Sequence, residues 1–208
     1  MKHNLKYKKL TVQLALVGLA GLTLPAFAAD SVTAPVVVTG TRIEQNSFDL
    51  PMSINSISGD AIRDAQQQVN LSEVAVRIPG IVVNNRNQAA QELSITSRGF
   101  GSRSQFGIRG VRIYSDGIPL TMPDGQGTTG TFNLDTADRI EVLRGPFSAL
   151  YGNSSGGVIQ IFTKNGGPDN EVSSSAFYGS YGTHRESLTY SGKKDQLDYV
   201  LNASQFET

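Results

Sequence analysis

The chain has 208 residues, of which 22 are glycine and 38% are hydrophobic; this composition indicates a turn-rich β or α+β protein rather than a disordered one. It contains no cysteine, which excludes disulfides and cysteine-ligated metals, and its two histidines, His3 and His184, cannot form a histidine-rich metal site. The formal net charge is zero, with 18 basic and 18 acidic residues, and the absence of a basic tract beyond the N-terminus argues against a nucleic-acid partner.

The first 28 residues have the pattern of a secretory signal peptide. Met1 to Lys9 carries four lysines, Leu10 to Leu24 is an apolar run of fifteen residues, and Ala26 and Ala28 are the small residues that a signal peptidase reads. The alternative is a transmembrane helix, but fifteen residues are fewer than the roughly twenty that a bilayer core requires. We therefore expect residues 1–28 to be removed, which leaves 14 basic residues against 18 acidic ones.

Residues 29–45 form an extended segment and a linker. Val36, Val37 and Val38 are stiff at χ1 and favour the β region, and Pro35 before them blocks a helix. The segment is either exposed ahead of the domain or the ordinary first strand of it. Its position behind a signal peptide and before the polar residues 44–47 favours the first alternative.

Short strands and helices follow in alternation. Ser58 and Asp60 are typical of a helix start before Ala61 to Gln67, and Asn70 with Glu73 forms the capping box of a second short helix that Pro79-Gly80 ends. The strands predicted around these helices are Leu50 to Ile57, Ile81 to Val83, Leu93 to Thr96, Val111 to Ser115 and Ile118 to Leu120. Polar or glycine-rich stretches at 84–91, 100–105 and 121–132 are predicted loops.

A strand, a sharp turn, a glycine-dense loop and a second strand occupy residues 138–163. Arg139 to Leu143 is predicted to be a half-buried strand because Glu141 interrupts its apolar run. The elements expected after it are a stop at Gly145-Pro146, one helical turn at Ser148 to Tyr151, a tight loop at Gly152 to Gly157 and a buried strand at Val158 to Phe162.

Beyond residue 168 the pattern changes to strands of period two. Plausible strands cover Val172 to Tyr181 and His184 to Tyr190, and in the next one Leu197 and Leu201 share one face while Asn202 falls on the other. Each strand of a membrane barrel has such a pattern, and so has a strand of a further soluble sheet.

No catalytic motif has the context that its chemistry needs. Gly152 to Gly156 matches the G-x-S-x-G nucleophile elbow, but a strand and not a helix follows its serine, and nothing orients His184. A phosphate-binding G-x-x-x-x-G-K-[ST] loop is absent, since no lysine precedes a serine or threonine. We expect no enzymatic activity.

The string LRGPFSALYGNSSGGVIQIFT, residues 143–163, resembles the end of the plug domain of TonB-dependent outer-membrane receptors. The resemblance implies an α+β plug domain at 46–166, a small mixed β-sheet with short helices. It also implies that residues 171–208 are the first antiparallel strands of a transmembrane β-barrel. The family's barrel has 22 strands and needs several hundred more residues, so the chain is expected to be a fragment.

The resemblance also implies a function, that of an active transporter of the cell outer membrane that needs no cofactor. Residues Val36, Val37, Val38 and Thr39 are similar to the TonB box, which would add a strand to the edge of the periplasmic partner TonB. Arg109 and Arg144 stand in RG motifs whose arginines pair with glutamates inside the barrel and lock the plug, although surface arginines are the alternative. Lipid would be contacted through the missing barrel.

The ligand is expected at loops that point away from the TonB side in the resembling plugs. Their cations, amides and apolar groups suit an anionic, partly planar molecule, unless the loops are merely solvated. The residues concerned are Arg86, Gln88, Phe100, Arg103, Gln105, Met122, Asp124 and Gln126. Most receptors of the family take ferric siderophores, whereas the string YSDGIPLTMPDGQG resembles the branch that includes receptors for pyrroloquinoline quinone. The alternative to a membrane transporter is a soluble periplasmic binding or interaction module.

Overall fold

The structure is a computed structural model, and it describes residues 37–39, 43, 45–64, 66–85, 92–104, 107–130, 133–145, 147–152 and 154–208. All of these belong to one structural unit, Pro35–Thr208. Several predictions fall outside the described residues: the signal peptide at 1–28, Val36 of the segment Val36 to Thr39 that is similar to the TonB box (the predicted docking segment), and the loop residues Arg86, Gln88 and Gln105.

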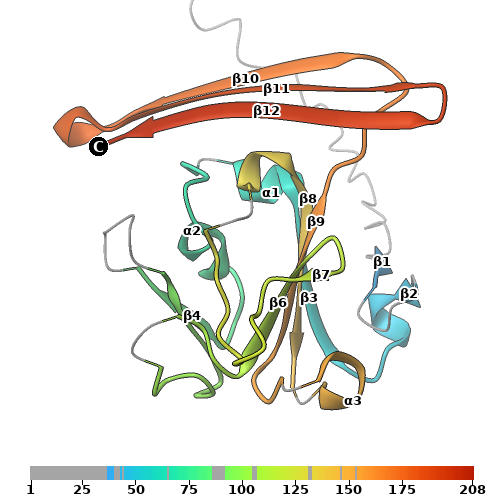
Figure 1. Cartoon of the computed structure of the whole chain (residues 1–208), viewed down its shortest axis with the longest axis vertical. Helices are drawn as coiled ribbons and strands as arrows, with labels where there is room; N and C mark the ends of the chain where they lie inside the picture. The colour runs from blue at the N-terminus through green and yellow to red at the C-terminus, as the bar shows by residue number, and fades with distance from the viewer. Residues whose placement is uncertain are drawn as a thin grey trace, which may run out of the picture. The chain divides into compact units, whose positions relative to one another are not determined.

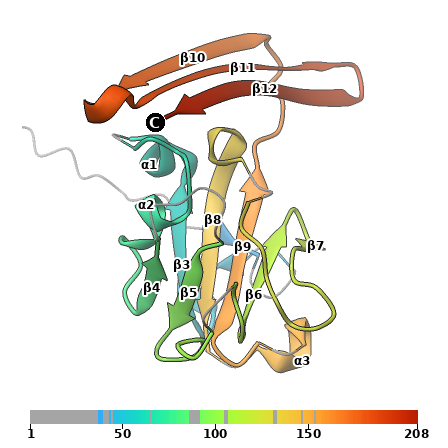
Figure 2. The same ribbon diagram turned by 60° about the vertical axis from the view of Figure 1, so that its left-hand side comes forward.

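A mixed five-stranded sheet forms the centre of the domain (Figure 1), and Figure 2 shows its strands side by side. Strands β6 and β9 pair in parallel, and the other neighbours pair antiparallel. In spatial order the strands are β3 (Ser53–Ser58), β8 (Ala137–Arg144), β9 (Gly157–Thr163), β6 (Val111–Ser115) and β7 (Ile118–Pro119).

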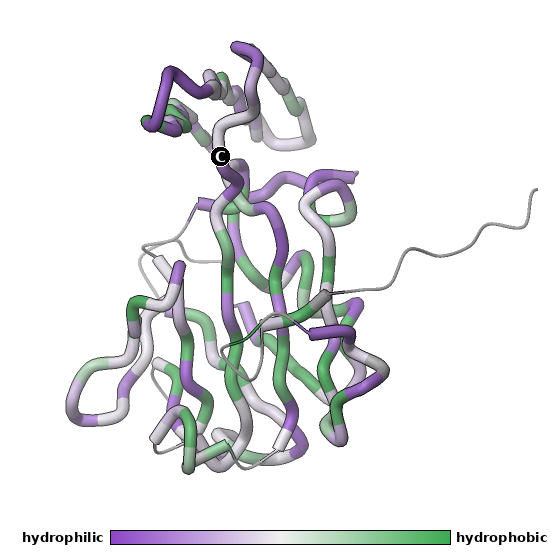
Figure 3. Tube along the Cα trace, turned by 90° about the vertical axis from the view of Figure 1, so that its right-hand side faces the viewer, coloured by the Kyte–Doolittle hydropathy of each residue, from purple (hydrophilic) through white to green (hydrophobic). Residues whose placement is uncertain are grey.

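Strands β8 and β9 lie inside the sheet, and their apolar residues are buried in the core. Ile140, Leu143 and Val158 have no exposed surface, and Figure 3 shows hydrophobic stretches along the long strands. Glu141 is also fully buried, at 0% exposure. The expectation that this strand is half-buried is therefore wrong, because Thr39, more than a hundred residues away in the sequence, covers the carboxylate of Glu141.

Two short helices pack on the sheet through Ile62, Leu71 and Val74. Helix α1 (Gly59–Arg63) begins where the Ser58 hydroxyl accepts a hydrogen bond from the Ala61 amide, and it ends earlier than expected because the backbone of Asp64 is extended. Helix α2 (Ser72–Ala75) is preceded by the expected pair of reciprocal hydrogen bonds between Asn70 and the first turn. The side chain of Asn70 accepts from the Ser72 amide, and Glu73 accepts from the Asn70 amide. Within the described ranges, no helix is long and apolar enough to cross a membrane.

Smaller elements surround the central sheet. Two separate antiparallel ladders join β1 (Val37–Val38) to β2 (Gln45–Asn46), and β4 (Ile81–Asn84) to β5 (Ser94–Ser97). The remaining short helices are η1 (Ser47–Asp49), η2 (Leu134–Thr136), α3 (Ser148–Tyr151) and η3 (Ser180–Gly182). The helical turn expected at Ser148 to Tyr151 is thus confirmed.

The last three strands form an antiparallel sheet of their own: β10 (Glu171–Tyr178), β11 (His184–Lys194) and β12 (Leu197–Glu207). In β11 the polar residues Arg185, Ser187 and Thr189 are buried, whereas Leu188 is 52% exposed. Leu201 of β12 is 63% exposed. This sheet therefore turns apolar side chains outward, the reverse of a sheet in a soluble protein. The expected architecture, a small mixed sheet with short helices followed by antiparallel strands, is confirmed.

Candidate functional site

A hollow of about 760 Å³ opens between two of the loops expected to contact a ligand. Two cations, an amide and an aromatic ring meet there, on a floor that is rich in glycine. The lining residues are Gly99, Phe100, Gly101, Ser102, Arg103, Ser104, Arg109, Gly110 and Gln126. Since no acidic residue lines the hollow among the described residues, its electrostatic character favours an anion.

The glycine-dense corner before β9 packs against the loop that lines this hollow. The Gly156 amide donates to the carbonyl oxygen of Gly110 at 2.7 Å. A Cβ atom at residue 156 would stand 2.9 Å from the Phe100 Cβ and 3.0 Å from the Gly110 oxygen, which is closer than side chains pack. Residue 156 is therefore glycine because the loop at 99–110 rests directly on it.

The structure brings together some of the residues expected to bind ligand. Phe100, Arg103 and Gln126 line the hollow, from loops that are separate in sequence. Met122 and Asp124 lie on the same loop as Gln126 but do not line the hollow. The Asp124 carboxylate accepts a hydrogen bond from the backbone N–H of Gln126 at 2.9 Å. Their predicted role in ligand binding stays a prediction.

The two arginines expected to lock the plug have different surroundings. Arg109 lines the hollow. Arg144 donates from Nη1 to the carbonyl oxygen of Pro79 at 2.9 Å, while its Nε is buried without a hydrogen-bond partner. Neither forms an ion pair within the part of the chain that the structure describes. The lock through these two residues remains a prediction.

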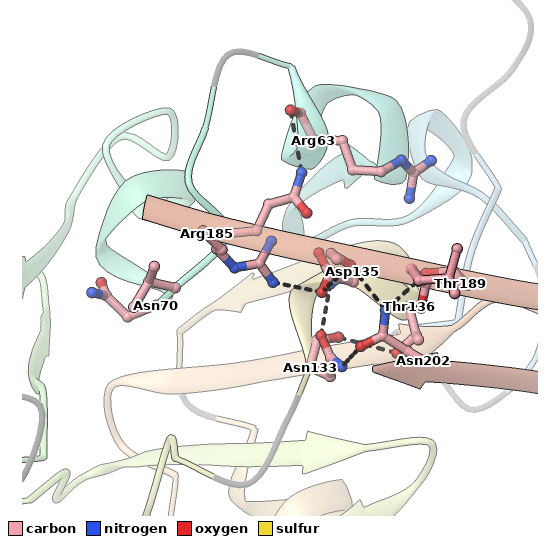
Figure 4. A network of polar contacts seen from close by, with 12 residues as sticks. Arg63, Asn70, Asn133, Asp135, Thr136, Arg185, Thr189 and Asn202 are labelled. Carbon is pink, nitrogen blue, oxygen red and sulfur yellow. Dashed lines mark hydrogen bonds and ion pairs between the residues drawn. The ribbon is translucent and has the colours of Figure 1, made fainter. Parts of the chain in front are cut away.

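A different ion pair connects the central domain to the last sheet. Arg185 of β11 contacts Asp135 of η2 at 2.5 Å, and both side chains are buried, with 7% and 4% of their surface exposed. The Ser187 hydroxyl donates to the same carboxylate oxygen at 3.0 Å, and Asn133 donates to the side chain of Asn202 at 2.6 Å (Figure 4). Sequence reasoning missed this network, because nothing local in the sequence relates Asp135 to a residue 50 positions later.

The described part of the predicted docking segment is itself paired. Val37 and Val38 form a ladder with Asn46 and Gln45, and Val38 is fully buried. The expectation that this segment is exposed ahead of the domain is therefore wrong at Val38. Thr39 donates its backbone N–H to the Glu141 carboxylate at 2.9 Å. Sequence reasoning did not assign a role to Glu141, although a charged residue inside an apolar strand was the available signal.

The family model described as TonB-dependent Receptor Plug Domain matches residues 46–158, which is more than half of the chain. The chain belongs to this family of plug domains. The two helices, the hollow and four of the five central strands fall within the matched residues, and the match ends at the start of β9. The family is one of receptors and not of enzymes. Ser154, in the motif that resembles a nucleophile elbow, is fully buried and donates to the carbonyl oxygen of Gly152.

Solved receptor structures share the fold of this plug domain. The outer-membrane pyoverdine receptor FpvA of Pseudomonas aeruginosa PAO1 is 22% identical, with a TM-score of 0.65 over 83% of this chain and 24% of FpvA. BauA, the ferric preacinetobactin receptor of Acinetobacter baumannii, is 19% identical, with a TM-score of 0.66 over 83% of this chain and 26% of BauA. The ferric-catecholate import receptor Fiu of E. coli K12 is 24% identical, with a TM-score of 0.59 over 79% of this chain and 22% of Fiu.

The chain spans about a quarter of the length of these receptors. The match to FpvA covers more of the chain than the plug model does, so it is not limited to the plug domain. The sheet of β10, β11 and β12 follows the plug domain as the first barrel strands were expected to.

Proposed function

We propose that the plug domain is the N-terminal part of a TonB-dependent receptor of the outer membrane, which takes up a scarce anionic nutrient. The observation that carries the proposal is the hollow between the loops, where Phe100, Arg103, Arg109 and Gln126 converge without an acidic neighbour in the described residues. Arginine binds carboxylates and other oxyanions in bidentate fashion and stacks on flat rings, so the hollow fits an anionic ligand with planar groups.

The last sheet supports a membrane location for the receptor. Val172, Tyr190 and Leu201 occupy one cross-strand row through β10, β11 and β12, and all three are exposed. The neighbouring row, Ser173, Thr189 and Asn202, is polar and lies on the opposite face. Lipid-facing apolar residues that alternate with polar inner residues are the signature of an outer-membrane strand. The alternative of a soluble periplasmic module requires these apolar side chains to face water.

The periplasmic partner of the receptor would be TonB. Residues Val36 to Thr39 are the proposed docking segment, which would pair its backbone with the edge of a TonB sheet. The short β1 strand supports this proposal, because Val37 and Val38 take up an extended conformation in a ladder separate from the central sheet.

A ferric siderophore is the ligand class that we favour. The similar receptors named above are described as receptors for pyoverdine, ferric preacinetobactin and ferric catecholates. Pyrroloquinoline quinone, a flat tricarboxylate, is the second candidate. It is supported by the resemblance of the string at residues 114–127 and by the two arginines that line the hollow.

Titration calorimetry on the intact receptor tests the ligand class. We expect saturable binding of a ferric siderophore, and we expect Arg103→Ala to weaken it by about tenfold or more, because a charge-assisted contact is lost. Arg77→Ala is the matched control, since Arg77 is exposed and does not line the hollow. Saturable binding of the metal-free quinone alone, weakened by Arg103→Ala, would assign the receptor to the quinone. Equal effects of the two arginine variants would contradict the site.

A further inference from the structure

The side chain of Gln126 supplies the amide of the hollow, and it lies against the backbone of Gly107. A Cβ atom at residue 107 would stand 2.8 Å from the Gln126 Nε2 and 2.9 Å from its Cγ, so a larger residue there would displace this side chain. Residue 107 also has a φ of +67°, which favours glycine. The position of the amide therefore depends on close contact between two separate loops.

The loop that carries Gln126 is attached at its base to the buried residue Ile108. The backbone of Gly127 forms two hydrogen bonds with that of Ile108, at 2.8 and 3.4 Å. Further along the loop, the backbone N–H of Met122 donates to the Gln126 oxygen at 2.8 Å, and the Asp124 carboxylate accepts from the backbone N–H of Gln126. The tip of the loop is thus a closed turn, and its place above the hollow is set by the residues at its base.

A second attachment of this loop is made by Glu92. Its Oε2 accepts the backbone N–H of Thr129 at 2.8 Å and the hydroxyl of the same residue at 2.9 Å. Thr129 is buried, with 8% of its surface exposed, whereas Glu92 is exposed and precedes the buried residue Leu93. The Glu92 carboxylate therefore connects the end of the loop to the segment that enters β5.

The bonds to Glu92 are among the strongest contacts that this part of the loop makes in the described structure. A hydrogen bond to an ionised acceptor is roughly twice as strong as one between neutral groups. By comparison, the backbone N–H of Thr128 lies 3.4 Å from the Leu120 oxygen, beyond the usual range for such a bond. Loss of the Glu92 carboxylate would therefore leave the end of the loop weakly held.

We propose that Glu92 is a positioning residue for the ligand site: by holding Thr129, it keeps the loop at 121–130 where Gln126 lines the hollow against Gly107. The inference rests on the proposed function, since it assumes that a ligand binds in the hollow. Glu92 itself does not line the hollow, so its effect on a ligand passes through the loop. One side of the site is then formed before the ligand arrives, which lowers the ordering cost of binding.

Hydrogen exchange of the intact receptor without ligand measures whether Glu92 holds the loop. We expect Glu92→Ala to raise the exchange rate of the backbone amides at 121–130 by about tenfold or more, because charge-assisted hydrogen bonds are lost. Glu92→Gln keeps an acceptor oxygen without the charge, and it is expected to raise the rate by a smaller factor.

Asp116→Asn is the matched control for Glu92→Gln. The Asp116 carboxylate accepts the backbone N–H of Thr163 at 2.7 Å and its hydroxyl at 2.6 Å, the same pair of donors at the ends of β6 and β9. Residue 116 has a φ of +49°, a conformation that asparagine also adopts. We expect Asp116→Asn to change neither the exchange at 121–130 nor ligand affinity.

Titration calorimetry tests whether Glu92 acts through Gln126. The probe is the compound that saturates the wild-type receptor, either a ferric siderophore or the metal-free quinone. We expect Glu92→Ala and Gln126→Ala each to weaken its binding by about three- to tenfold, the loss of one neutral hydrogen bond. The double variant is expected to bind no more weakly than Gln126→Ala alone, because both changes remove the same contact.

Unchanged exchange at 121–130 in Glu92→Ala would refute the holding contact. An equal increase in Asp116→Asn would also refute it, because the effect would then be a general loosening of the domain. Faster exchange with unchanged affinity, or additive losses in the double variant, would show that Glu92 does not position Gln126 for the ligand. If the wild type binds neither compound while Glu92→Ala exchanges faster, the proposed function fails and the holding of the loop by Glu92 stands.

Discussion

Single charged residues connect parts of this chain that are far apart in sequence. Asp135 and Glu141 are both buried carboxylates, and each takes donors from a distant segment, Arg185 in one case and Thr39 in the other. Because a buried charge is costly without partners, each carboxylate makes the arrangement of two segments depend on one contact. The consequences of removing a single partner are therefore large.

We expect Arg185→Met to lower the stability of the intact protein by about 3–5 kcal/mol, because it leaves the Asp135 carboxylate buried without a cation. The double variant Asp135→Leu, Arg185→Met removes both charges and is expected to recover most of the loss. Thermal unfolding of the wild type and of the two variants measures the difference. A single variant as stable as the wild type would show that the ion pair contributes nothing.

A substitution at Gly156 is expected to destabilise the protein by steric overlap. We expect Gly156→Ala to cost about 1–3 kcal/mol in stability, because its methyl group displaces Phe100 and Gly110 from the floor of the hollow. Ligand affinity should fall with it. Gly130→Ala is the control, since a Cβ there would meet only the Glu92 carboxylate, at an ordinary distance of 3.6 Å. Calorimetry and thermal unfolding of both variants give the comparison, and equal losses in the two would refute the explanation.

At the level of elements, local signals in the sequence predicted most of the plug domain. Strand β6 has the predicted bounds, Val111–Ser115, and the reciprocal hydrogen bonds before α2 form as the pair Asn70 and Glu73 indicates. The bounds of such elements depend on residues that are close together in the sequence, so they can be predicted from the sequence alone. The burial of Glu141 depends on a residue 102 positions away, and the convergence of Arg103 with Arg109 and Gln126 depends on how loops pack. No local pattern carries that information, so these parts of the site required the structure.

A prediction about uptake concerns the β1 strand. Val37→Pro removes a backbone N–H from the docking segment, so we expect it to abolish uptake while ligand binding at the cell surface stays intact. Val37→Thr keeps the N–H and the β-branched side chain, and it is expected to retain uptake. Transport of radiolabelled ligand into cells, measured beside binding at low temperature, separates the two steps. Normal uptake in Val37→Pro would remove the docking role from this strand.

For the molecule as a whole, the two sheets follow opposite rules of burial. The central sheet buries its apolar residues, whereas the sheet of β10, β11 and β12 buries Ser187, Thr189 and Ser191 and exposes Leu188 and Leu201. The first pattern is that of a sheet surrounded by water, and the second is the pattern expected of strands that face lipid. Arg185, which is bound to Asp135, ties the last sheet to the central domain.

This contrast leads to a prediction about membrane assembly. We expect Leu201→Lys to destabilise the assembled receptor by about 2–4 kcal/mol if residue 201 lies near the bilayer midplane, because a cation would face lipid. Ser175→Lys is the control, because Ser175 alternates with the apolar row on β10 and lies on the polar side of the sheet. The amount of heat-resistant folded receptor in purified outer membranes reports assembly. Similar yields for the two variants would contradict a lipid-facing position for Leu201.

The attachment of Thr39 to β8 also has a mechanical consequence. Strand β8 is held by six residue pairs to β3 and by six to β9, whereas β1 is held to β2 by only two. A force applied ahead of Thr39 therefore meets its weakest resistance first, in the short ladder and then in the carboxylate contact, before any load reaches the central sheet. We therefore expect β1 to detach under a smaller force than the one that separates β8 from its neighbours, so the central sheet would bear load only after β1 has been released.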